Sequence, residues 1–234
     1  MTIFHKSMLL GAVAIAEVED DPQLTQVLLE PTGEVVAINK WALYVASPSV
    51  PVVVKSLPLN DTALNEAVGV SVTQIEELCR SIPSDRQFKS LLEHVSVVTD
   101  TGNVLKTAFN NGRGLQHVTL RAGQIGNALA TWRARFKELG TTVHNSSINF
   151  LFNRARLKSV VAAIEVSCKY HGEFDSVVQR PFSNGYVWLA RNGQTQQSIT
   201  IAWVMPTGNP ELTFWEKNLL GIASIKKPLT RPSR

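Results

Sequence analysis

The sequence predicts an α+β protein built from repeated units, each a helix followed by three antiparallel strands. Stretches with apolar residues at helical spacing occur three times, and each precedes β-rich runs that are separated by turn residues. The copies recur at intervals of roughly seventy to eighty residues, and they share the order of helix and strands rather than sequence identity. With 234 residues and 44% hydrophobic content, the chain can build a sizeable core.

The first unit is predicted to begin with a helix over residues 5–16. Strands are expected at 24–30, 34–39 and 41–46, because β-forming residues there are separated by Pro31-Thr32-Gly33 and similar turn residues. Between residues 47 and 69, three prolines exclude a helix and indicate an edge strand or a connecting segment.

The second unit opens at Ser71, where a serine followed three residues later by Gln74 is typical of a capping box. In that motif the serine hydroxyl accepts a hydrogen bond from the backbone N–H three residues later, and the glutamine side chain accepts one from the backbone N–H of the serine. Pro83 should interrupt the helix, and a second helical piece is expected to follow it. Strands are predicted at 95–99, 104–109 and 115–121.

A linking helix is expected over 125–139, with an apolar side made of Leu129, Trp132, Phe136 and Leu139. The third unit has a predicted helix over 153–169. Its expected buried stripe consists of Leu157, Val160, Val161, Ile164 and Cys168. Strands should follow at 175–181, 186–191 and 198–205.

We therefore expect a two-unit domain over 1–123, a linking segment over 124–147, a third unit over 148–207 and a C-terminal helix with a basic tail over 208–234. The apolar stretch within 210–222 favours packing on the body, and a docking surface for a partner is the alternative.

Catalytic and metal-binding patterns are missing from the sequence. Cys168 and His171 are the one pair of histidine or cysteine residues at a spacing of three or four, which supplies too few ligands for a local zinc motif. No nucleophile elbow or phosphate loop occurs. We expect no enzyme activity and no cofactor. Cys79 and Cys168 occupy apolar helix positions as free thiols, which is typical of a reducing, cytoplasmic environment. No segment is long and apolar enough to span a membrane.

The formal charge of +4 and pI of 9.2 permit contact with nucleic acid. Cations on the predicted helices of the second and third units could bind the phosphate backbone of DNA, and such contacts do not depend on the base sequence. These candidate DNA-contacting residues are Arg80, Arg86, Lys89, Arg154, Arg156 and Lys158. The alternative is that they form ordinary solvated helix faces. Trp215, Lys226 and Lys227 are candidates for binding a partner protein.

The order of residues 8–13, 27–30 and 36–46 resembles the opening of the bacterial sliding clamps of DNA replication. In those clamps a helix precedes a strand, a turn and an Ala-Thr-Asp-Gly-His-x-Leu stretch. This chain departs from that motif, because Ile38, Asn39, Lys40 and Trp41 replace Thr-Asp-Gly-His. Residues 1–123 resemble one clamp domain and 148–207 resemble half of another. Clamp subunits contain an even number of units, whereas three are predicted here.

The resemblance implies helices that face duplex DNA, strand edges that pair into a homo-oligomer, and replication or assembly proteins as partners. Our leading hypothesis is a non-enzymatic, DNA-associated protein that binds without sequence specificity. The alternative is a scaffold protein that assembles through strand edges and the C-terminal segment, with no nucleic acid role. An enzyme with a dispersed active site is a third hypothesis.

Overall fold

The computed structural model describes residues 2–16, 24–48, 63–83, 93–140, 154–169, 177–183, 185–191 and 198–203. Within these residues the chain forms helices and strands in the order β1 (Thr2–His5), α1 (Lys6–Ile15), β2 (Gln26–Leu29), β3 (Val35–Ile38), β4 (Ala42–Ser47), β5 (Val68–Ser71), α2 (Val72–Ser81), β6 (His94–Thr99), β7 (Val104–Asn110), β8 (Leu115–Gly123), α4 (Asn127–Ala130), α5 (Trp132–Lys137), α6 (Arg154–Lys169), β9 (Val177–Phe182), β10 (Gly185–Arg191) and β11 (Ser198–Trp203). The predicted α+β class is confirmed, and in each of the three units a predicted helix precedes three strands within the described residues. The helical piece expected after Pro83 lies outside the described residues.

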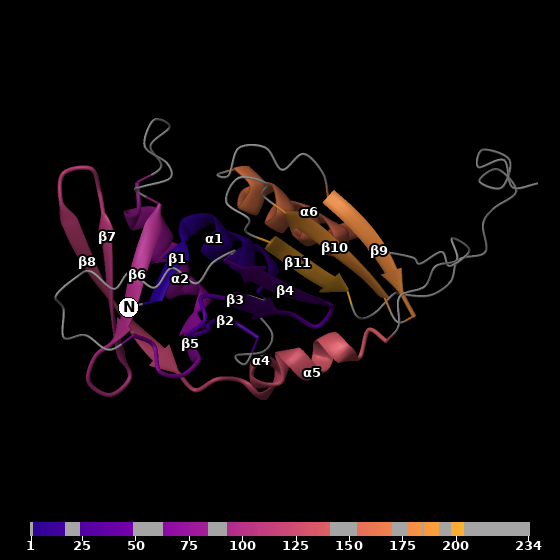
Figure 1. Ribbon diagram of the computed structural model, residues 1–234, viewed down its shortest axis with the longest axis horizontal. Coiled ribbons are helices and arrows are strands. Elements are labelled where there is room, and N and C mark those ends of the chain that lie inside the picture. The colour runs from indigo at the N-terminus through magenta and orange to yellow at the C-terminus, as the bar shows by residue number, and fades with distance from the viewer. Residues whose placement is uncertain are drawn as a thin grey trace, which may run out of the picture.

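The described strands belong to one antiparallel sheet with the order β1-β6-β7-β8-β5-β2-β3-β4-β11-β10-β9. Figure 1 shows α1 and α6 on one side of this sheet and α4 and α5 on the other. The third unit joins the first where β11 pairs with β4, in a register that matches Trp203 with Ala42.

Each of the first two units begins with a strand that the sequence did not reveal. β1 precedes α1, and β5 precedes α2, so the unit is strand, helix and three strands. β1 pairs with β6 of the second unit, and β5 pairs with β2 of the first. Both strands have only four residues and pair with segments far away in sequence, as Thr2 does with Val97. Local periodicity is too short to detect such strands.

The central strands are covered on both faces, because successive side chains of a strand point to opposite sides. Val27, Val35 and Tyr44 pack in the core beneath α1, α2 and α6. Leu28, Val36 and Leu43 pack in a second core beneath α4 and α5. The helices of the repeated units therefore lie on one side of the sheet and the linking helices lie on the other.

The linking helix expected over 125–139 is two short helices. They meet at Thr131, whose φ and ψ of −103° and 17° leave the helical range. Its hydroxyl donates to the Asn127 carbonyl at 2.8 Å, and a β-branched residue loses side-chain freedom within a helix. The predicted apolar side is confirmed, because Leu129 and Leu139 are buried in the second core.

The buried face of α6 is rotated from the predicted stripe. Val160, Ala163 and Ser167 are buried, whereas Leu157 and Val161 are exposed. The cause is a close approach between α6 and α1. A Cβ built on Gly11 would overlap both the Ser167 and Tyr44 hydroxyl groups, so the residue of α6 that faces Gly11 has to be small. The side chain of Cys168 lies outside the described part.

The start of α2 agrees only in part with the predicted capping box. Ser71 is the N-cap, and its hydroxyl accepts from the Gln74 N–H at 3.4 Å. The Gln74 side-chain amide does not accept the hydrogen bond from the Ser71 N–H that the capping box predicts. Its oxygen accepts from the N–H of Arg121 in β8 at 2.7 Å, while its nitrogen donates to the Ser71 hydroxyl at 3.0 Å. The cap of α2 thus also ties the helix to β8.

Candidate nucleic-acid interface

The helices of the repeated units form a layer in which α1 lies between α2 and α6. Their order follows from the sheet, because β5 places the start of α2 beside the first unit and β11 brings the third unit against β4. The sequence predicted the three helices, and the structure brings them together. This helical layer is the surface on which the candidate DNA-contacting residues were expected.

Two of those six residues have described side chains. Arg80 is exposed on the last turn of α2 and forms an ion pair with Glu76 at 3.3 Å. Lys158 is exposed on α6. Arg154 and Arg156 lie on the first turn of α6, but their side chains fall outside the described part, as do Arg86 and Lys89 altogether.

The described charges of this layer are mixed. Alongside Arg80 and Lys158, it carries Glu76 and Glu77 on α2 and Glu165 on α6. The middle helix, α1, has Lys6 as its one charged residue, and Lys6 is 5% exposed. Its ammonium group donates to the Ile82 carbonyl at 2.5 Å. The centre of the layer is therefore apolar, and its exposed cations lie on the flanking helices.

A buried polar cluster joins the first two units beneath this layer. The Nδ1 atom of His5 lies 2.8 Å from the Ser7 hydroxyl, and its Nε2 atom lies 3.6 Å from the Glu93 carboxylate. This order of serine, histidine and acid resembles a catalytic triad, and sequence spacing did not predict it. All three residues are at most 3% exposed. A substrate could not reach the serine, so the cluster serves to hold β1 and α1 against β6.

The strand β8 has a long unpaired edge within the described part. β8 pairs with β7 over residues 115–121, but with β5 only at Gly123 and Ala122. No described strand pairs with the other edge of β8 over 115–121. Leu115, at the start of this strand, is 59% exposed. Exposed backbone N–H and C=O groups in such an edge can pair with a strand of another chain.

The linking helices are fixed to the sheet by the carboxylate of Glu30. Trp132 donates its ring N–H to this carboxylate at 2.8 Å, and the Arg133 guanidinium lies 3.1 Å from the same oxygen. The guanidinium also stacks over the Trp132 ring, 4.3 Å from its centroid. The sequence indicated the apolar side of this segment but not this polar contact, because Glu30 is about a hundred residues away.

The candidate partner-binding residues Trp215, Lys226 and Lys227 lie outside the described part. Among the residues that are described, no group of three or more His, Cys, Asp or Glu side chains could hold a metal ion. None of the described helices is long and apolar enough to cross a membrane.

No family model and no curated protein matches this chain. The solved structures that resemble it include sliding clamps. PCNA of A. fulgidus, bound to the C-terminal region of FEN-1, shares 12% identity, covers 90% of this chain and 99% of its own, and gives a TM-score of 0.48. The beta sliding clamp of C. crescentus shares 12% identity, covers 90% of this chain and 66% of its own, and gives 0.49.

A third structure, provisionally assigned as a DNA polymerase III beta subunit of Eubacterium rectale, shares 11% identity. It covers 95% of this chain and 68% of its own, with a TM-score of 0.46. At such low identity these likenesses concern the fold, and we argue function from this chain's own strands and helices.

Proposed function

We propose that this chain is a non-enzymatic, clamp-like subunit that associates with duplex DNA through its helical layer and offers a platform for partner proteins. The observation that carries the proposal is the strand exchange between the first two units. β1 pairs with β6 and β5 pairs with β2, so α1 and α2 lie on the same side of one sheet. α6 packs against α1 and extends that layer.

The proposed DNA contacts are those of the helical cations with phosphate groups. α6 begins with Arg154, Arg156 and Lys158, three cations within its first five residues. Arg80 contributes less, because Glu76 already pairs with it in solvent. We expect α6 to carry most of the binding, with Arg86 and Lys89 adding to it. Contacts to phosphate alone would be indifferent to base sequence.

Salt dependence of binding tests this proposal. Retention of a duplex DNA fragment should fall steeply as salt rises, since each neutralised phosphate releases counterions. The double variant Arg154→Glu, Lys158→Glu should weaken binding equally for unrelated sequences and reduce the salt slope by roughly one per lost contact. Lys137→Glu is the matched control, because Lys137 is an exposed cation on α5, across the sheet. No retention at low salt would overturn the proposal.

A scaffold function without nucleic acid is the second candidate. It is favoured by the unpaired edge of β8 and by the apolar middle of the helical layer. A scaffold would form a defined oligomer whose size does not change when DNA is added. Light scattering with and without a DNA duplex separates the two functions.

A further inference from the structure

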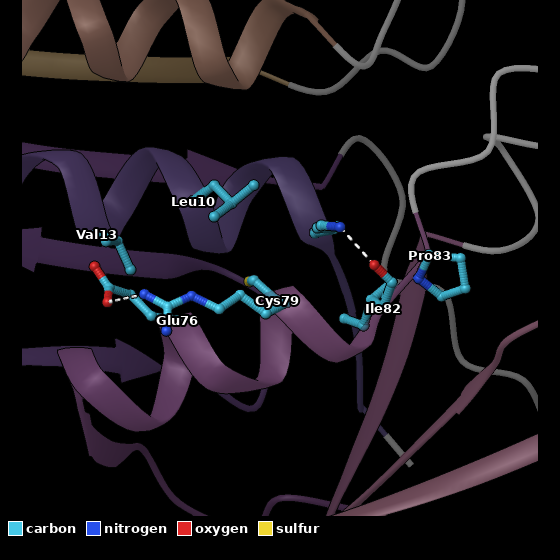
Figure 2. A pocket seen from close by; sticks show the side chains of 8 residues that line it. Leu10, Val13, Glu76, Cys79, Ile82 and Pro83 are labelled. Atoms are coloured by element: carbon cyan, nitrogen blue, oxygen red, sulfur yellow. Dashed lines mark hydrogen bonds and ion pairs between the residues drawn. The ribbon is translucent and has the colours of Figure 1, made fainter.

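An apolar groove of about 480 Å³ lies between α1 and α2 on the outer surface of the helical layer. Leu10 and Val13 of α1 line one wall, and Cys79 and Ile82 line the other. Figure 2 shows these side chains facing the space between the two helices. The Glu76–Arg80 ion pair lies on the rim of the groove.

The floor of the groove is suited to apolar side chains. Lys6 also lines it, but its ammonium group donates to the Ile82 carbonyl at the end of α2. Burial raises the pKa of the Cys79 thiol to about 12, against the opposing effect of Lys6, so the thiol is neutral near pH 7. A ligand for this groove would bury apolar groups and meet one cation and one anion at the rim.

The chain leaves the described part near the C-terminal end of α1, the helix that forms one wall of the groove. Trp203, the last residue of β11, is paired with Ala42. The neighbouring Asn39 donates its side-chain amide to the Ile15 carbonyl at the end of α1. Val13, in the last turn of the same helix, lines the groove. Six further residues, 204–209, can extend about 20 Å, which exceeds the length of about 15 Å expected for a ten-residue helix.

The sequence that follows has the chemistry that the groove requires. Residues 210–220 contain Leu212, Phe214, Trp215, Leu219 and Leu220 as apolar side chains. Two aromatic rings would fill a space of this size and release their apolar area from water. Glu216 and Lys217 follow directly and complement the Arg80 and Glu76 charges of the rim.

We propose that residues 210–220 of the same chain dock in the groove between α1 and α2, with Phe214 and Trp215 against its apolar walls. Docking brings the tail 226–234, with four basic residues and no acidic one, onto the helical layer. The tail then adds positive charge to a surface whose described charges are mixed. The docking does not depend on DNA, so it can be tested in its absence.

Photocrosslinking of the full chain tests the proposal directly. With p-benzoylphenylalanine in place of Trp215, irradiation should join residue 215 to residues 6–13 or 72–83 of the same molecule, as mapped by mass spectrometry. Crosslinks to other segments, covalent dimers as the main product, or no crosslink would each overturn it. Covalent dimers would assign the groove to a second copy.

Fluorescence of Trp215 is the independent measurement. The emission of Trp215 is obtained by subtracting the spectrum of Trp215→Phe from that of the full chain. Val13→Glu should shift this emission to longer wavelength, because a carboxylate in the groove excludes the aromatic pair. Thr73→Glu, an exposed change on α2 outside the groove, should leave it unchanged. An emission already typical of solvent in the unmodified chain would overturn the docking.

Discussion

At the residue scale, single side chains determine how closely the helices approach. Gly11 lets α6 lie against α1, and the space a Cβ would need holds the Ser167 and Tyr44 hydroxyl groups. Tyr44 in turn donates to the Met8 carbonyl or to Ser167, from which its oxygen is 3.1 Å and 3.0 Å away. A glycine costs helix stability of about 1 kcal/mol relative to alanine. Here that cost is offset by a hydrogen-bonded contact between the first and third units.

The buried thiol of Cys79 should make the protein less stable in alkali. Its pKa is raised from 9.0 to about 12, first by burial, so the folded state holds a proton that the unfolded state loses above pH 9. The stability that the neutral Cys79 thiol contributes is present below pH 9 and is lost as pH rises towards 12. Between pH 8 and 10.5 we expect a loss of about 2 kcal/mol from this group.

Urea unfolding at both pH values, under reducing conditions, checks this expectation. Cys79→Ala is the comparison, since it removes the thiol and leaves Lys6 and the other titrating groups in place. The variant should show the smaller alkaline loss of unfolding free energy. Equal losses in the two proteins would contradict the assignment.

At the element scale, the contact between α2 and β8 depends on one side chain. Gln74 links the N-cap of α2 to the Arg121 N–H of β8, so it connects a helix to the last strand of its own unit. Because β8 meets β5 at only two residue pairs, this amide supports the end of the strand where the sheet pairing is shortest.

Gln74→Ala should lower the unfolding free energy by about 1 kcal/mol, the usual net value of a lost hydrogen bond. It should also speed amide exchange at Arg121, because water replaces the Gln74 oxygen. Thr73→Ala is a matched control on the same exposed turn. If both variants exchange Arg121 at the same rate, the link has no role in holding β8.

At the scale of the whole molecule, the sheet has unpaired strand edges within the described part that can join copies of the chain. The edge of β8 is the stronger candidate, since it is unpaired over seven residues within the described part. β9 contains Pro181, which has no N–H to donate. Closed rings avoid exposed edges by pairing such strands between subunits.

Leu115→Lys should shift the protein towards smaller species, because charge on an edge strand opposes pairing. Sedimentation velocity over a range of protein concentrations measures the shift. Leu157→Lys makes the same change at an exposed position of α6 and should not alter assembly. A wild-type protein that is monomeric at every concentration would rule out assembly through this edge.

The type and order of most helices and strands follow from the sequence alone. Apolar residues at helical spacing indicate α1, α2 and α6, and β-rich runs between turn residues indicate nine of the strands. Cys79 was expected to be buried, and it is 2% exposed. The positions of the candidate cations on α2 and α6 also follow from the sequence. These features depend on neighbouring residues, so the spacing of apolar residues along a short segment predicts them.

Pairing and orientation are decided by the tertiary structure. The four-residue strands β1 and β5 exist because distant partners supply their hydrogen bonds. The rotation of α6 follows from the close contact of Ser167 with Gly11 of α1, and the partners of Gln74 and Glu30 lie on other elements. The helical layer itself depends on strand exchange between units. A contact between residues a hundred positions apart leaves no local pattern, so the sequence could predict the units but not how they join.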